Sequence, residues 1–76
     1  MTLTAKQIRS ARVLLGWTQV RLALEGEISF LRIKKFELGK GRLSILEIST
    51  IRRLFESAGI VFTNGAEPGV KLRKPE

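Results

Sequence analysis

The sequence predicts a mainly α fold in which four helices precede a C-terminal β-hairpin. Apolar residues recur with helical spacing as far as Gly59, and Ser, Thr and Gly residues divide this part of the chain into short segments. After Gly59, apolar and basic residues alternate, which is typical of strands. We therefore expect a helical domain over residues 1–59 and a hairpin over residues 60–76.

The first and fourth helices supply most of a small predicted core. Each carries one apolar face, formed by Ile8, Ala11 and Leu15 in the first helix and by Ile48, Ile51, Phe55 and Ala58 in the fourth. Ser44 and Glu47 have the spacing of a capping box, which predicts the start of the fourth helix. Trp17 lies between a helix-ending Gly16 and Thr18, so we expect it to pack as a lid on this core.

A second helix is expected between Thr18 and Gly26. Thr18 is a typical N-cap residue, and Gly26 is a typical stop. Val20, Leu22 and Ala23 are predicted to form its inward side.

The third helix is expected between Ser29, another N-cap residue, and Gly39. Ile33 and Phe36 lie three residues apart and share its inner face. Its other faces are basic and carry Arg32, Lys34 and Lys35. Two short helices separated by a tight turn, the second with a cationic outer face, have the geometry that places a helix in a DNA major groove.

The C-terminal segment predicts a hairpin with strands at 60–63 and 70–73, joined through a turn signal at Asn64-Gly65. An isolated hairpin exposes two edges, so its apolar face needs a partner. One hypothesis is a homodimer contact through Ile60, Phe62, Val70 and Leu72. The alternative is a hairpin that folds back on its own domain.

Composition favours a small cytoplasmic protein with a polyanionic partner. The chain has 76 residues and a formal net charge of +7, with a pI near 10.9. No apolar run reaches the length of a membrane span, and no signal-peptide core is found. With no Cys, His or Asp, we expect neither a metal site nor another cofactor, and we do not expect an enzyme.

The helical part resembles the lambda and Cro repressor type of helix-turn-helix regulator, the Xre family. The likeness depends on Gln19 and Ala23 in the second helix and on a set of turn, cap and core residues, Ile28, Ser29, Ile33, Phe36 and Glu37. Thr4–Arg9, followed by Arg12 and Gly16-Trp17-Thr18, is similar to the family's first helix, and Glu47–Gly59 is similar to its fourth. The resemblance covers about three quarters of the chain and implies a lambda-repressor-like DNA-binding domain.

The family pairs an arginine late in the first helix with a glutamate at the end of the recognition helix, and Arg12 and Glu37 occupy these places. The resemblance therefore implies a partly buried ion pair that fixes the angle between the helices. The alternative is two solvated surface charges, worth under about 1 kcal/mol.

Two positions depart from the family pattern. Glu27 stands where the family usually has Gly, so either the turn is shifted by one residue or Glu27 adopts a positive φ at a cost of about 1 kcal/mol or more. Phe30 and Leu31 stand where relatives often carry polar base-reading side chains. Apolar side chains can pack on thymine methyl groups, but they can also form a patch for a protein partner.

The predicted function is sequence-specific binding of double-stranded DNA by a homodimeric repressor or autoregulator, with residues 29–38 as the recognition helix. The predicted contact residues are Gln19, Ser29, Phe30, Leu31, Arg32, Lys34, Lys35, Lys40 and Arg42. Lys40 and Arg42 lie in a Gly-Lys-Gly-Arg loop suited to phosphate contacts, and the resemblance implies a backbone contact for Gln19. The alternative function is a protein-protein adaptor that binds through Phe30 and Leu31.

Overall fold

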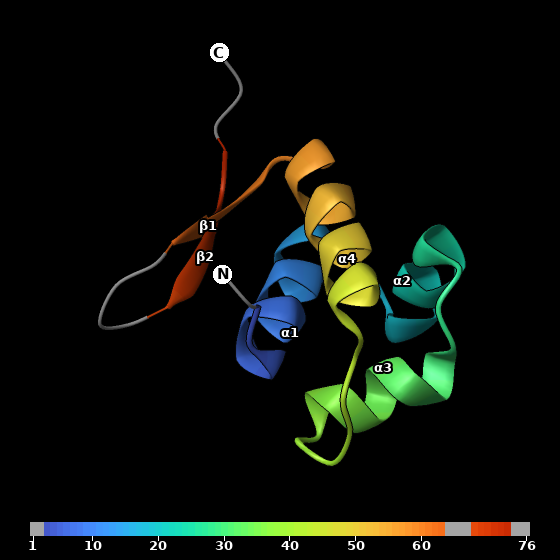
Figure 1. Ribbon diagram of the computed structural model, residues 1–76. Helices are drawn as coiled ribbons and strands as arrows, with labels where there is room; N and C mark the ends of the chain where they lie inside the picture. Colours follow the sequence, from blue (N-terminus) through green and yellow to red (C-terminus); the bar gives the residue numbers. More distant parts are fainter. Residues whose placement is uncertain (1–2, 64–67, 74–76) are drawn as a thin grey trace.

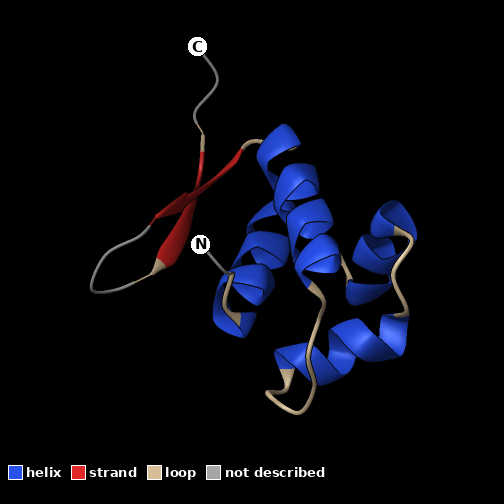
Figure 2. Cartoon of the chain, in the orientation of Figure 1, coloured by secondary structure: helices blue, strands red, loops and turns tan. Residues whose placement is uncertain are grey.

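Four helices and a two-stranded antiparallel hairpin follow one another in the computed structural model, which describes residues 3–63 and 68–73 (Figures 1 and 2). The elements are α1 (Ala5–Leu15), α2 (Gln19–Gly26), α3 (Phe30–Glu37), α4 (Ile45–Ser57), β1 (Ile60–Thr63) and β2 (Gly69–Leu72). The predicted order of four helices and a hairpin is therefore confirmed. Within the described ranges, no helix combines the length and apolar character needed to cross a bilayer.

Polar caps explain where the helices begin. The predicted caps Thr18, Ser29 and Ser44 each accept a hydrogen bond from a backbone N–H in the first turn of α2, α3 and α4, respectively. The predicted capping box is present, because the Glu47 side chain also accepts from the Ser44 N–H. A second capping box, between Thr4 and Gln7, starts α1.

The turn between α2 and α3 adopts the second of the two predicted alternatives, a positive φ at Glu27. Glu27 has φ 53° and ψ 43°, in the left-handed region, and directly follows the last residue of α2. A left-handed conformation costs a non-glycine residue about 1 to 2 kcal/mol. Gly26 remains helical, and a Cβ there would lie 3.1 Å from Cδ1 of the buried Ile28. A glycine at position 26 thus allows Ile28 to pack against the end of α2.

One core joins all the helices to the first strand. Its buried apolar residues are Leu3, Ile8, Ala11, Leu22, Ala23, Ile28, Ile33, Ile48, Ile51, Phe55 and Ile60. The predicted core residues Leu15 and Phe36 pack partly buried against this cluster, as does Trp17, whose ring centroid lies 5.8 Å from that of Phe55. Two predictions were wrong. Val20 is exposed, one turn from the exposed Leu24, and Ala58 is exposed because α4 ends before it.

The hairpin folds back on its own domain. Ile60 pairs with Leu72 and Phe62 with Val70; β1 contacts α4, and β2 contacts α1. The second strand begins at Gly69, one residue earlier than predicted, while the predicted turn at Asn64-Gly65 lies outside the described residues. Nε2 of the buried Gln7 links α1 to the hairpin by donating to the Gly69 carbonyl at 3.2 Å and to the Thr63 carbonyl at 3.4 Å.

This packing takes Ile60 out of the predicted dimer surface, whereas the other three residues of that surface remain a prediction. Ile60 is fully enclosed in the core of its own chain, so it cannot form a contact between copies. Phe62 and Val70 pack partly buried against the same core, and Leu72 remains exposed. The apolar face of the hairpin therefore already has most of its partner within the chain.

Candidate nucleic-acid interface

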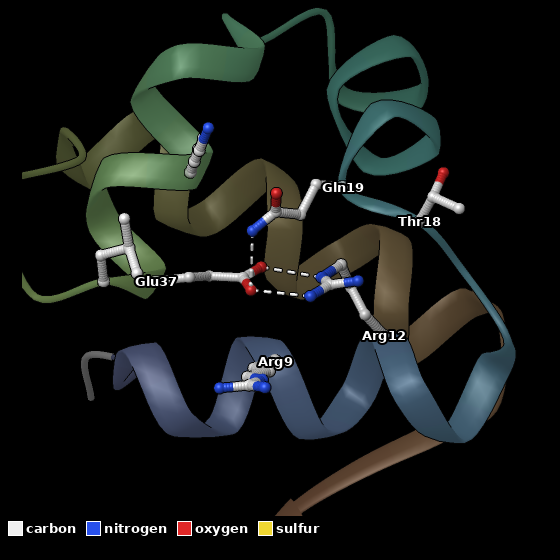
Figure 3. Close-up of a pocket in the computed structure, with 7 residues that line it drawn as sticks. Arg9, Arg12, Thr18, Gln19 and Glu37 are labelled. Carbon is white, nitrogen blue, oxygen red and sulfur yellow. Dashed lines mark hydrogen bonds and ion pairs between the residues drawn. The ribbon is translucent and has the colours of Figure 1, made fainter.

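A buried polar network fixes α3 against α1 and the start of α2 (Figure 3). Arg12 Nε donates to Glu37 Oε2 at 2.8 Å, and Arg12 Nη2 donates to Glu37 Oε1 at 2.7 Å. The third guanidinium nitrogen donates to the Trp17 carbonyl at 2.9 Å, while Gln19 Nε2 donates to Glu37 Oε1 at 3.1 Å. The predicted ion pair thus forms in a bidentate arrangement, which constrains direction as well as distance.

The burial of this pair makes it a structural contact rather than a surface one. The side chains of Arg12 and Glu37 are only 13% and 4% exposed. Loss of either partner would leave a charge enclosed by protein with fewer hydrogen bonds, a costly state. Gln19 belongs to this network, so the donor predicted to contact a DNA backbone is engaged with Glu37.

An open pocket lies beside the network, where α1, the start of α2 and α3 meet (Figure 3). Its volume is about 490 Å³, and its lining includes Arg9 from α1, Thr18 and Gln19 from the start of α2, and Lys34 from α3. Arg9 and Lys34 are exposed and form no ion pair with another described residue. Two cations beside a helix N-terminus make this pocket attractive to an anion such as a backbone phosphate.

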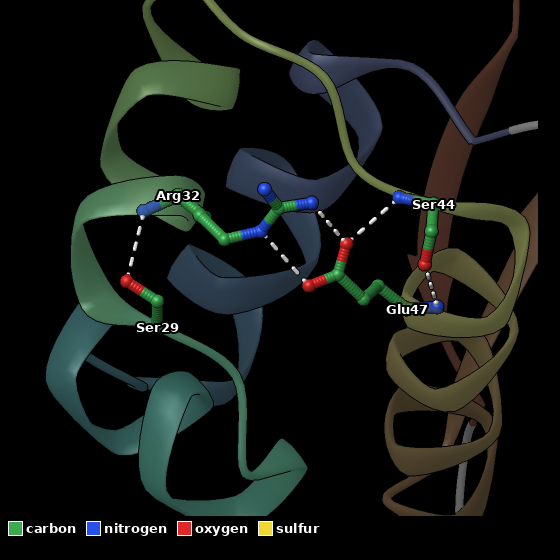
Figure 4. Close-up of polar contacts among 4 residues, drawn as sticks. All are labelled: Ser29, Arg32, Ser44 and Glu47. Carbon is green, nitrogen blue, oxygen red and sulfur yellow. Dashed lines mark hydrogen bonds and ion pairs between the residues drawn. The ribbon is translucent and has the colours of Figure 1, made fainter.

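Arg32, a predicted DNA contact, is paired with a carboxylate of its own chain. Its Nε donates to Glu47 Oε2 at 3.0 Å and its Nη2 donates to Glu47 Oε1 at 2.5 Å (Figure 4). Glu47 at the same time accepts the Ser44 N–H of the capping box. Arg32 therefore connects α3 to the start of α4, and its charge is neutralised within the protein. No local spacing reveals this pair, because fifteen positions separate the two residues.

The Arg32 contact changes the acidity of Glu47. Hydrogen bonds from the Arg32 side chain and then from the Ser44 N–H lower the pKa of Glu47 from 4.5 to about 2, and the same pairing raises the pKa of Arg32. A carboxyl with a lowered folded-state pKa stabilises the fold above its unfolded pKa, and this contribution is lost as the pH falls toward the folded value.

We therefore expect Glu47→Gln to lower the free energy of unfolding at neutral pH, with most of the difference disappearing between pH 4.5 and about 2. Urea unfolding monitored by Trp17 fluorescence over this range measures the effect. Glu56→Gln is the matched control, because the Glu56 side chain is 44% exposed against 21% for Glu47, and loss of its pair with Arg52 should cost little. A Glu47→Gln deficit that stays constant with pH would contradict the assignment.

The outer face of α3 carries most of the other predicted contact residues. Lys34 and Lys35 are exposed, and neither forms an ion pair with a described residue. Phe30 and Leu31 lie in the first turn of α3 and are 38% and 59% exposed. Ser29 is exposed as well, although its hydroxyl accepts the Arg32 N–H as the helix cap. The start of α3 thus presents two apolar side chains, with two free cations one turn later.

The loop after α3 adds cations beside the C-terminal end of the helix. A Cβ on Gly41 would lie 3.1 Å from the Lys35 Cβ, so the loop passes directly beside α3. Lys40 and Arg42 flank this contact, and both are exposed. Close approach at a glycine therefore brings the predicted phosphate-binding loop next to Lys35.

No protein-family model matches this chain, and no curated protein sequence matches it.

Proposed function

We propose that this protein is a sequence-specific DNA-binding transcriptional regulator that places α3 in the major groove. The observation that carries the proposal is that α3 is held in one orientation while its outer face is exposed. The Arg12–Glu37–Gln19 network orients α3, while Phe30, Leu31, Lys34 and Lys35 remain available to a partner. A major groove admits one α-helix, and orientation of that helix determines which side chains reach base edges.

The contacts divide into positioning and reading groups. Arg9, Lys40 and Arg42 lie in a pocket or loop beside α3 and suit phosphate contacts, which position a protein without reading sequence. Phe30 and Leu31 suit thymine methyl groups. The apolar pair therefore supports a T-rich half-site.

The proposed regulator acts as a homodimeric repressor or autoregulator. Two copies bound to half-sites about 34 Å apart would place both α3 helices on successive faces of the major groove. A formal net charge of +7 supports association with DNA, but it opposes contact between two free copies. We therefore assign formation of the dimer to the DNA-bound state.

The proposal predicts that Lys34→Ala and Lys35→Ala each weaken DNA binding by about 1 kcal/mol or more, and that the salt slope falls by about one for a phosphate contact. Fluorescence anisotropy at two salt concentrations measures both quantities on a selected duplex. Arg53→Ala is the control, because it removes an exposed cation from α4 instead of α3. Equal losses in all three variants would mean that net charge alone drives binding.

The exposure of Phe30 and Leu31 favours one alternative, a protein-protein adaptor. Two exposed apolar residues at the start of one helix suit a protein interface as well as a base edge. In that case Phe30→Ala would abolish binding to the partner protein, whereas the two lysine variants would retain it. The same set of variants therefore separates the two functions.

A further inference from the structure

A second surface, away from the outer face of α3, lies between α1 and β2. It is a groove of about 580 Å³ lined by Lys6, Arg9, Ser10, Val13, Leu14 and Val70. Its apolar floor is open to solvent, since Val13 is 68% exposed and Leu14 is 45% exposed. Neither residue belongs to the core, and the proposed DNA contacts use neither of them.

The strand at one wall of this groove has an unpaired edge. Arg73 N–H donates to the Gly59 carbonyl at 2.6 Å, and hydrogen-bonded pairs alternate along an antiparallel ladder. In the observed register, Lys71 is therefore in a hydrogen-bonded pair with Val61, whereas Val70 and Leu72 direct their N–H and C=O groups away from β1. In the described part of the chain, the backbone N–H and C=O groups of Val70 and Leu72 form no hydrogen bond with another element. An exposed edge of this kind can accept an additional strand.

Both charged residues that line the groove in the described part of the chain are cationic, Lys6 and Arg9 on α1. Lys71 and Arg73 add positive charge to the same strand, although they alternate with Val70 and so lie on the other face of the hairpin. Neither α1 nor β2 contains an acidic residue. The groove therefore combines an apolar floor, a free strand edge and cationic borders.

We propose that this groove binds an extended acidic segment of a partner protein, which adds to β2 as a third strand. Alternate apolar side chains of that segment would pack on Val13 and Leu14, and its carboxylates would face Lys6 and Arg9. Backbone pairing supplies affinity in this mode of recognition, and the side chains supply specificity.

Charge and chemistry favour this occupant over two others. A second copy pairing β2 against β2 would bring Lys71 and Arg73 close to the same residues of its partner, and like charges across strands are destabilising. A DNA backbone would satisfy Lys6 and Arg9 but would leave Val13 and Leu14 without apolar contacts. An acidic strand satisfies both kinds of group.

The position of Arg9 gives the groove a consequence for DNA binding. Arg9 also lines the pocket beside Gln19 (Figure 3), to which Lys34 contributes as well. An acidic segment that engages Arg9 would withdraw a cation from that pocket and weaken DNA binding. This consequence rests on the proposed function, whereas occupation of the groove does not.

The test is a titration of the full chain with a capped synthetic peptide of alternating Glu and Val, followed by backbone amide NMR. The expected result is that the Val70 and Leu72 amides shift and become protected from hydrogen exchange, together with shifts along α1. Shifts confined to Lys34, Lys35 and Lys40 would show a polyanion bound at the α3 face and would overturn the proposal. Absence of binding would overturn it as well, as would protection of Val70 and Leu72 in a peptide-free dimer detected by sedimentation.

Matched variants locate the site. Val13→Glu places a carboxylate in the groove and is expected to raise the peptide Kd about tenfold or more. Leu24→Glu makes the same change at an exposed residue of α2 and should leave the Kd unchanged. Both positions are exposed, and unchanged amide spectra elsewhere will show that each variant folds. Equal Kd values for the two variants would contradict the assignment, regardless of whether the protein binds DNA.

Discussion

Arg12→Ala is expected to destabilise the protein by about 3 to 5 kcal/mol, because it leaves the Glu37 carboxylate buried without its cation. Glu37 is almost fully enclosed, and Gln19 would be its remaining side-chain donor among the described residues. For a small domain this is a large part of the total stability. Urea unfolding followed by Trp17 fluorescence measures the change.

Arg52→Ala is the matched control for this prediction. Arg52 also pairs with a glutamate, Glu56, but the two side chains are much more exposed and lie one helical turn apart. Its loss should cost about 0.5 kcal/mol or less. Similar losses for Arg12→Ala and Arg52→Ala would contradict a structural role for the buried pair. A double change, Arg12→Met with Glu37→Met, should cost less than the sum of the two single changes.

Ile60→Ala is expected to cost about 2 to 5 kcal/mol, because it opens a cavity in the core that β1 shares with the helices. Ile60 is as completely buried as Ile51 in α4 and Leu22 in α2. Leu72→Ala is the control, since Leu72 pairs with Ile60 but is exposed. Thermal unfolding by circular dichroism measures both. A loss below about 1 kcal/mol for Ile60→Ala would contradict the claim that β1 shares the core with the helices.

A chain that lacks the hairpin is expected to lose its fold. If the hairpin were a free dimer arm, removal of residues 60–76 would yield a folded monomer. Because Ile60 fills the core and Gln7 bonds to the hairpin carbonyls, the truncated chain is expected to be largely unfolded at room temperature. Sedimentation combined with circular dichroism distinguishes a folded monomer from an unfolded one.

Local signals in the sequence account for most of the fold. Cap residues and apolar periodicity predict the helices because both act within a few residues along the chain. The ion pair of Arg12 with Glu37 was predicted only through a family resemblance, since no local spacing joins α1 to the end of α3. Glu27 could be recognised as an unusual residue for its turn, but the conformation it adopts depends on how Ile28 packs.

Contacts between distant elements explain what the sequence did not reveal. The sequence predicts an unpaired Arg32 side chain, but the arrangement of α3 and α4 brings this side chain to Glu47. Gln7 is likewise an ordinary polar residue of a first turn until the hairpin carbonyls reach it. Such pairs depend on tertiary geometry, so composition and periodicity do not predict them.

Selection from a randomised duplex library is the most direct test of the proposal that α3 reads DNA. The bound sequences are compared with a scrambled duplex at two salt concentrations, which separates base recognition from attraction by charge. We expect an inverted repeat whose half-sites lie about ten base pairs apart, preferred at least about a thousandfold over the scrambled duplex. Weak, strongly salt-dependent binding with no enriched motif would contradict the proposal.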